Sequence, residues 1–182
     1  MKNLLYLVMI FMSFNCFGQK LKLQNLKIVD YEIESNDIKI KSYSTLEKNG
    51  ILTVYSDSWD GQHYFRYKLT DEEINTINSL TEKNLESFVE KKELNKNQYF
   101  AGNPKFISYK MNGKETSLRF IEPFMSNEFK TILKVLSSKI YKHDNAAKID
   151  MQKSDFTKIK MEIEKRSKID NYLPVKSVII QN

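Results

Sequence analysis

The residues best suited to chemistry in this chain lie in one short segment, Asp57-Ser58-Trp59-Asp60-Gly61. Its two carboxylates and its glycine could begin a calcium-binding loop, but the further oxygen ligands and terminal glutamate of an EF-hand do not follow. Ser58 has His63 nearby as a base, yet nothing predicts the strained elbow that exposes a nucleophilic serine. Hairpin turns commonly contain Asp-Gly. We therefore interpret the segment as a turn without catalytic or metal-binding residues.

The remaining ionisable residues indicate no stronger site. His63 and His143 are the only histidines, and neither has a second histidine at the spacing of metal ligands, so we interpret both as structural. Asp71, Glu72 and Glu73 could be imagined as a glycosidase pair, but such pairs face each other across a cleft, whereas these acids open a predicted helix. No phosphate loop or dinucleotide fingerprint is present, and we predict no cofactor.

The best candidate for a surface that contacts a ligand or partner is formed by Trp59, Tyr55, Tyr64 and Arg66. Aromatic rings stack on sugars or anchor protein partners, and arginine adds directional hydrogen-bond donors. The competing interpretation is that these rings are buried beneath the C-terminal segment, and the usual burial of aromatic residues favours it.

These residues belong to a predicted three-stranded meander over about residues 38–69. Asn49-Gly50 predicts a two-residue turn that pairs Lys48 with Ile51 and Leu46 with Thr53. Asp60-Gly61 predicts the next turn, which pairs Trp59 with Gln62 and Leu52 with Leu69. One face of the meander is then apolar and consists of Leu52, Val54, Phe65, Tyr67 and Leu69.

Two helices and one more hairpin follow the meander. Thr70 and Glu73 predict a capping box, and Ile74, Ile77 and Leu80 form the buried stripe of the helix that it starts. Asn112-Gly113 predicts a second strong hairpin, which places Ile107, Tyr109 and Met111 on the same face as Thr116, Leu118 and Phe120. Ser126 predicts the start of a helix with an apolar stripe, formed by Phe129, Ile132, Leu133, Leu136 and Ile140. We therefore predict an α+β fold, an antiparallel sheet of hairpins with two main amphipathic helices packed on one face.

The C-terminal segment, residues 144–182, is less clear. Residues 144–155 lack periodicity and are expected to connect two elements. Phe156, Ile159 and Ile163 fit a helix about as well as Ile159, Met161 and Ile163 fit a strand. Residues 172–180 end apolar and β-branched, which favours a late strand docked on the sheet.

The first 18 residues have the pattern of a signal peptide. Lys2 is followed by an apolar stretch from Leu4 to Phe14, and small residues precede a cleavage site before Gln19. The alternative is lipid attachment at Cys16, although Phe14 and Asn15 fit a lipoprotein signal poorly. Either way we expect an exported protein, periplasmic, secreted or lipid-anchored in the envelope.

Cleavage before Gln19 leaves one domain, residues 19–182, with no transmembrane helix and no cysteine for a disulfide. The full chain has a formal net charge of +6, which the loss of Lys2 reduces to +5. A basic protein can bind nucleic acid, but export separates it from most nucleic acid, so we predict no nucleic-acid partner.

The segment from about residue 38 to residue 140 resembles small exported Bacteroidota domains of unknown function. The resemblance rests on Gly50-Ile51-Leu52-Thr53-Val54-Tyr55, then Gly61, Tyr64, Tyr67-Lys68-Leu69-Thr70 with Glu72-Glu73, and the hairpin from Phe106 to Phe120. Such families have no assigned activity, so the resemblance implies no functional residue.

Two functions from different classes follow. The first is a noncatalytic binding or interaction module of the cell envelope, whose partner is an envelope protein or a glycan. The second is a hydrolase of glycans or peptides whose acids are assembled from distant positions. The missing catalytic motifs favour the first.

Overall fold

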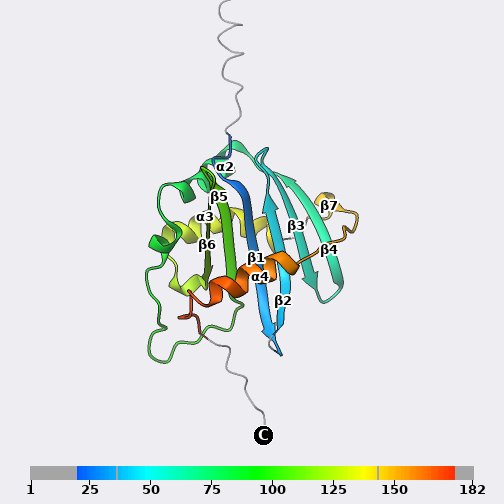
Figure 1. Cartoon of the computed structure of the whole chain (residues 1–182). Coiled ribbons are helices and arrows are strands. Elements are labelled where there is room, and N and C mark those ends of the chain that lie inside the picture. Colours follow the sequence, from blue (N-terminus) through cyan, green and yellow to red (C-terminus); the bar gives the residue numbers. More distant parts are fainter. Residues whose placement is uncertain (1–19, 36, 143, 175–182) are drawn as a thin grey trace, which may run out of the picture.

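The computed structural model describes residues 20–35, 37–142 and 144–174, and its centre is a seven-stranded antiparallel sheet (Figure 1). The strands are β1 (Gln24–Glu34), β2 (Asp37–Leu46), β3 (Ile51–Ser58), β4 (Gly61–Lys68), β5 (Lys105–Met111), β6 (Lys114–Phe120) and β7 (Lys148–Ile149). Their order across the sheet is β6-β5-β1-β2-β3-β4-β7. The predicted α+β class with an antiparallel sheet is confirmed.

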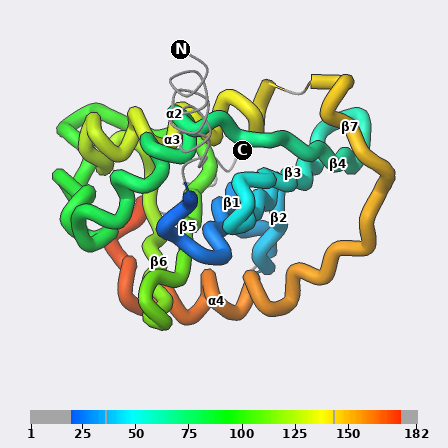
Figure 2. The backbone as a smooth tube through the Cα atoms, turned by 90° about the horizontal axis from the view of Figure 1, so that it is seen from above, coloured from blue at the N-terminus to red at the C-terminus, as the bar shows by residue number. Residues whose placement is uncertain are grey.

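Helices cover both faces of this sheet. The helices α2 (Asp71–Asn78) and α3 (Asn127–Ile140) lie on one face, whereas α4 (Thr157–Ser167) crosses the other, as Figure 2 shows from above. The two amphipathic helices expected on one face are α2 and α3. The ambiguous segment after residue 156 is helical, because Ile159 and Ile163 of α4 are buried against the sheet and Met161 is exposed.

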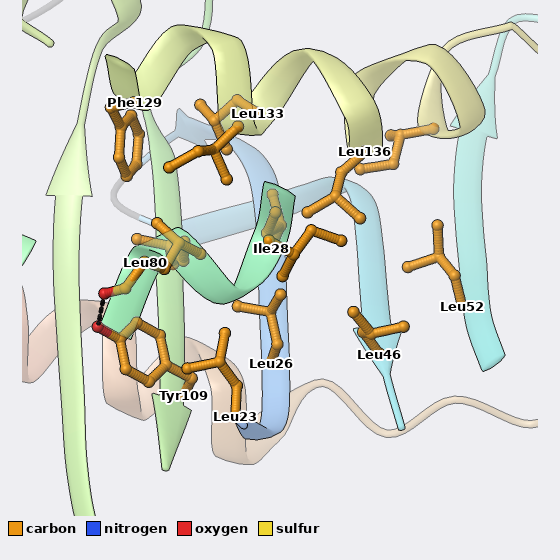
Figure 3. Packing of buried hydrophobic residues seen from close by; sticks show 14 of the residues in the cluster. Leu23, Leu26, Ile28, Leu46, Leu52, Leu80, Tyr109, Phe129, Leu133 and Leu136 are labelled. Carbon is orange, nitrogen blue, oxygen red and sulfur yellow. Dashed lines mark hydrogen bonds between the residues drawn. The ribbon is translucent and has the colours of Figure 1, made fainter. Parts of the chain in front are cut away.

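The larger hydrophobic core lies between the sheet and α2 and α3. Figure 3 shows Ile28 and Leu52 of the strands with Leu133 and Leu136 of α3 in this core. The hydroxyl of Tyr109 also donates to the carbonyl oxygen of Leu80 over 3.0 Å. A smaller core lies under α4 and includes Val29, Tyr31, Ile40, Tyr55, Tyr64 and Phe106.

The predicted register of the first hairpin is wrong by one residue. Leu46 pairs with Leu52 rather than with Thr53, and the amide of Glu47 donates to the carbonyl oxygen of Ile51 over 2.9 Å. The turn therefore has three central residues, with Gly50 in the left-handed region at a φ of 78°. A slip of one residue exchanges the two faces of a strand, and the observed register puts Leu46 into the larger core.

The second turn is also placed differently from the prediction. Ser58 pairs with Gly61, so the turn is Trp59-Asp60 rather than Asp60-Gly61, and Leu52 lies opposite Tyr67 rather than Leu69. The Ser58 hydroxyl donates to Asp60 Oδ1 over 2.7 Å and helps to close this turn. Because the register differs by two residues, the predicted apolar face keeps all its members.

The other local predictions are confirmed. Asn112-Gly113 forms the two-residue turn with both residues at positive φ, and Ile107 pairs with Leu118. Thr70 and Glu73 form both hydrogen bonds of the capping box, and Ser126 caps α3. Strand β1, in the middle of the sheet, lies outside the predicted meander. The signal peptide, Cys16 and His143 lie outside the described residues, as does most of the predicted late strand, of which residues 171–174 form turns and coil.

Candidate functional site

An open groove of about 950 Å³ lies on the face of the sheet that α4 crosses. One wall is formed by β2, β3 and β4, and the other by residues 150–156, which connect β7 to α4 and which we call the strap. In Figure 2 the strap runs apart from the strands before the chain returns in α4. The groove is therefore formed by segments that lie about 90 residues apart in the sequence.

The floor of the groove is aromatic and shielded from solvent. Tyr55 and Tyr64 are cross-strand partners on β3 and β4, with ring centroids 5.3 Å apart and exposures of only 5% and 4%. Phe156 at the end of the strap lies 4.9 Å from the ring of Tyr55. The Tyr64 and Ser154 hydroxyls are 2.7 Å apart and hydrogen-bonded, which fixes the strap to the sheet. Burial, the Asp57 carboxylate and Tyr64 raise the pKa of Tyr55 to about 12.

Ion pairs line the part of the groove near the turn between β1 and β2. Lys160 of α4 donates to both carboxylate oxygens of Asp37 over 2.9–3.0 Å. This bond, together with one from the Ile38 amide, lowers the pKa of Asp37 below its ordinary value. Lys39 lies 3.6 Å from Glu34 on the neighbouring strand. These four charges are thus compensated within the protein.

A second part of the groove, near the turn between β3 and β4 and at the same end of the sheet, carries polar groups without a partner in the described residues. Asp57 and Gln62, which are cross-strand partners, line the groove from the sheet, and Gln152 and Lys153 line it from the strap. None of these four side chains forms a hydrogen bond or ion pair with the described part of the chain. Their hydrogen-bonding capacity is therefore available to a bound molecule.

The structure separates the four residues predicted to contact a ligand. Tyr55 and Tyr64 are buried near the C-terminal segment, the interpretation that the sequence favoured for these rings. The burial favoured for these rings is wrong for Trp59, which is 98% exposed at the turn between β3 and β4; Trp59 does not itself line the groove, although Asp57, two residues earlier, does. Arg66 is exposed on β4 and does not line the groove.

The interpretation of residues 57–61 as a turn agrees with their contacts. Asp60 accepts a hydrogen bond from Ser58, and its other carboxylate oxygen lies 3.1 Å from Nε2 of His63. These contacts, that with Ser58 first, lower the pKa of Asp60. Ser58 therefore donates to a carboxylate rather than to His63 as a nucleophile would. Among the described residues, no group of three or more histidine, cysteine or acidic side chains is placed to hold a metal ion.

Sequence reasoning missed a polar row across five strands on the face that carries α3. Lys105, Asp30, Ser42, Ser56 and His63 are successive cross-strand partners. The row gave no sequence signal because each residue comes from a different strand. Its serines lie in regular strands rather than on a strained elbow, so the row does not have the geometry of a nucleophile.

At one end of this row, the largely buried Asp30 and Lys105 form a charge cluster with Tyr141, which ends α3 and is 48% exposed. Asp30 Oδ2 accepts hydrogen bonds from Lys105 Nζ and from the Tyr141 hydroxyl, each over 2.9 Å. Burial and the Asp30 carboxylate raise the pKa of Tyr141 to about 12. Burial alone would lower the pKa of Lys105, but Tyr141 and Asp30 outweigh it and raise that pKa. The cluster joins β1, β5 and α3.

No protein-family model, no curated protein and no solved structure matches this chain. None of the helices in the described residues is long and apolar enough to cross a membrane.

Proposed function

We propose that the protein is an exported, noncatalytic binding module of the cell envelope whose ligand occupies the groove. The observation that carries this proposal is a set of four polar lining side chains, Asp57, Gln62, Gln152 and Lys153, that have no hydrogen-bond or ion-pair partner in the described residues. The groove volume of about 950 Å³ falls in the range of about 300 to 1,000 Å³ that is usual for ligand sites. Export rests on residues 1–18 of the sequence alone, with a periplasmic or secreted location as the expected result.

Two features support binding rather than hydrolysis. A general acid needs a carboxyl group with a raised pKa. In the groove, the pKa of Asp37 is instead lowered, by hydrogen bonds from Lys160 and from the Ile38 amide. The only histidine described in the structure, His63, does not line the groove and faces Asp60 at the turn. The groove thus offers groups that hold a ligand rather than groups that transfer protons.

The test is a crosslinked affinity capture from the native envelope and culture medium with the full chain as bait. Gln62→Trp places a bulky side chain in the groove near the turn between β3 and β4. Lys48→Trp places the same side chain in the exposed turn between β2 and β3 and is the matched control. We expect a stoichiometric ligand or partner with the wild type and with Lys48→Trp, and its loss with Gln62→Trp. Equal capture by all three proteins would contradict the proposal.

The same experiment tests export. The intact mass of the recovered bait shows whether the mature chain begins at Gln19 or at an acylated Cys16. A bait that retains residues 1–18 would contradict cleavage.

A further inference from the structure

We infer that the ligand of the groove is an oligosaccharide, with one sugar ring stacked on Trp59 and its hydroxyl groups bound by Asp57, Gln62 and Gln152. This inference rests on the proposed function and names the ligand class of the same groove. It depends on the hydrogen-bonding capacity of the unpartnered lining residues, the position of the exposed Trp59 indole and the charge balance of the groove.

The unpartnered lining residues match the chemistry of a polyol. A sugar hydroxyl both donates and accepts hydrogen bonds. The Asp57 carboxylate accepts, whereas the amides of Gln62 and Gln152 do both, and Lys153 adds a donor from the strap. These groups lie on both walls of the groove, so a bound sugar would be held from the sheet and from the strap at once.

Trp59 supplies the apolar surface that a sugar ring also needs. Its side chain is 98% exposed, an unusual position for the largest apolar side chain. It follows Asp57 by two residues, so the two Cα atoms are about 7 Å apart or closer, which is within the reach of one sugar unit. A pyranose ring has an apolar C–H face and a polar edge, and this arrangement offers an indole for the face and a carboxylate with amides for the edge.

The charge balance of the lining disfavours strongly anionic ligands. Six charged residues line the groove, namely Glu34, Asp37, Asp57, Lys39, Lys153 and Lys160, and their formal charges cancel. A strongly anionic ligand such as a nucleic acid or an anionic lipid headgroup needs a net positive site. An uncharged or weakly charged ligand meets no such mismatch.

The apolar lining of the groove is mostly buried, apart from Met151, which is 72% exposed, and this disfavours the apolar side chains of an extended peptide. Peptides that add to a sheet need a free strand edge. Strand β7 occupies the outer edge of β4 at Tyr64 and Phe65, whereas residues 37–41 of β2 lie beyond the register with β3, so strand pairing alone does not decide against a peptide. Apolar peptide side chains need exposed apolar pockets, but Ile38, Ile40, Tyr55 and Tyr64 of the groove wall are only 4–7% exposed.

The experiment uses Trp59 as its own reporter, because it is the only tryptophan in the chain. The secreted form is titrated with cellotetraose, mannotetraose, xylotetraose and chitotetraose at millimolar concentration, and in parallel with a library of tetrapeptides. We expect at least one tetrasaccharide to shift the indole fluorescence to shorter wavelength. The same sugar should perturb the NMR amide signals of Asp57, Gln62 and Gln152.

Variants localise the binding. Trp59→Ala should weaken sugar binding roughly tenfold or more, which corresponds to about 1.4 kcal/mol, when it is measured by NMR. Asp57→Asn should weaken binding as well, because it removes the charged acceptor. Tyr99→Ala is the matched control, since Tyr99 is 90% exposed and does not line the groove. Sugar binding that survives both Trp59→Ala and Asp57→Asn would overturn the assignment.

The parallel peptide titration separates two kinds of failure. Peptides that perturb the groove when no sugar does would overturn the oligosaccharide inference and leave the proposed binding function standing. If neither the tetrasaccharides nor the tetrapeptides perturbed the groove, the inference would be overturned. If, in addition, Gln62→Trp captured the same material as the wild type, the proposed function would be contradicted as well.

Discussion

Lys105 Nζ lies 2.9 Å from Asp30 Oδ2, and the two residues are direct cross-strand partners whose side chains are only 13% and 11% exposed. Removing one partner of a buried ion pair leaves the other charge without compensation and costs about 3 to 5 kcal/mol. We therefore expect Lys105→Met to lower the free energy of unfolding by about 3 kcal/mol, as measured by urea denaturation.

A matched control and a double variant make this prediction specific. Lys39→Met removes a lysine from the Glu34 pair, whose side chains are 46% and 54% exposed, and should cost less than about 1 kcal/mol. The double variant Asp30→Leu with Lys105→Met should cost less than the sum of its single variants, because it leaves no unpaired charge. Additive losses would mean that the two side chains do not interact.

Three tyrosines with raised pKa values predict how the stability of the folded protein falls at alkaline pH. Burial, first among the causes, raises the pKa values of Tyr55, Tyr141 and Tyr172 to about 12. A raised pKa in the folded state contributes stability that is complete below the unfolded value of about 10 and is lost as the pH rises toward about 12. We expect the tyrosinate absorbance to include a late step near pH 12 that shrinks in Tyr55→Phe. Complete ionisation near pH 10 in the folded protein would contradict this.

The capping box of α2 has a measurable contribution to stability. The Thr70 hydroxyl accepts from the Glu73 amide over 3.2 Å, and the Glu73 carboxylate accepts from the Thr70 amide over 2.8 Å. Thr70→Ala should lower the free energy of unfolding by about 1 kcal/mol. Thr131→Ala is the control, because the Thr131 hydroxyl lies within α3 and donates to a carbonyl of the same helix rather than capping its end. A loss from Thr131→Ala as large as that from Thr70→Ala would mean that the cap is not the cause.

Glu73 adds an acid-side pH dependence to the same helix. Burial alone would raise its pKa, but hydrogen bonds from the Thr70 amide and from Lys139 outweigh it, and the net pKa is lowered. The stability from this carboxylate is therefore present above its unfolded pKa and lost as the pH falls through the lower folded value. We expect Glu73→Gln to reduce the slope of stability against pH in the acid range. An unchanged slope would contradict the assignment.

Two glycines at nearly equal backbone angles should differ in their tolerance of alanine. Gly50 and Gly113 have φ values of 78° and 79°. A Cβ at Gly50 would lie 2.9 Å from Ile74 Cδ1, whereas a Cβ at Gly113 would meet nothing within 4 Å. We expect Gly113→Ala to cost about 1 kcal/mol from the backbone conformation alone, and Gly50→Ala to cost more. Thermal unfolding of both variants provides the comparison, and equal losses would show that Ile74 moves aside without cost.

These two turns also show what the sequence could predict. The Asn112-Gly113 hairpin was predicted with its register because a two-residue turn with positive φ at both positions is specified locally. The register at Gly50 was not, because the choice between two and three turn residues depends on whether Leu46 reaches the larger core. That choice is made by α2 and α3, which pack on the strand from later in the chain.

The groove also could not be predicted from local sequence patterns, because segments far apart in the chain form it. Tyr55 and Tyr64 were identified as neighbours, and their burial was the favoured interpretation. The groove itself exists because α4 crosses the second face of the sheet and holds the strap over it. Asp37–Lys160, an ion pair in the groove lining, joins residues 123 positions apart. No periodicity in either segment indicates that contact.

The buried Asp170 carboxylate is one of several polar contacts that hold α4, alongside the ion pairs of Glu162, Lys160 and Arg166. Asp170 Oδ2 accepts from the backbone amide of Arg119 in β6 over 2.9 Å and from Arg166 Nε of α4 over 2.6 Å. Only Ile159 and Ile163 of α4 are buried, so apolar contacts hold this helix weakly. We expect Asp170→Ala to release α4 locally, since a low-stability unit opens before the whole domain.

Hydrogen exchange followed by mass spectrometry distinguishes local release from global destabilisation. In Asp170→Ala, amides of α4 should exchange at least about tenfold faster, equivalent to about 1.4 kcal/mol of local stability, because a buried carboxylate with two donors is lost. Amides of α3 should keep their protection, since α3 packs on the opposite face with the larger core. Lys168→Ala, an exposed residue next to α4, is the control and should leave both helices unchanged. Equal acceleration in α3 and α4 would contradict local anchoring, because it would mean that Asp170 stabilises the domain as a whole.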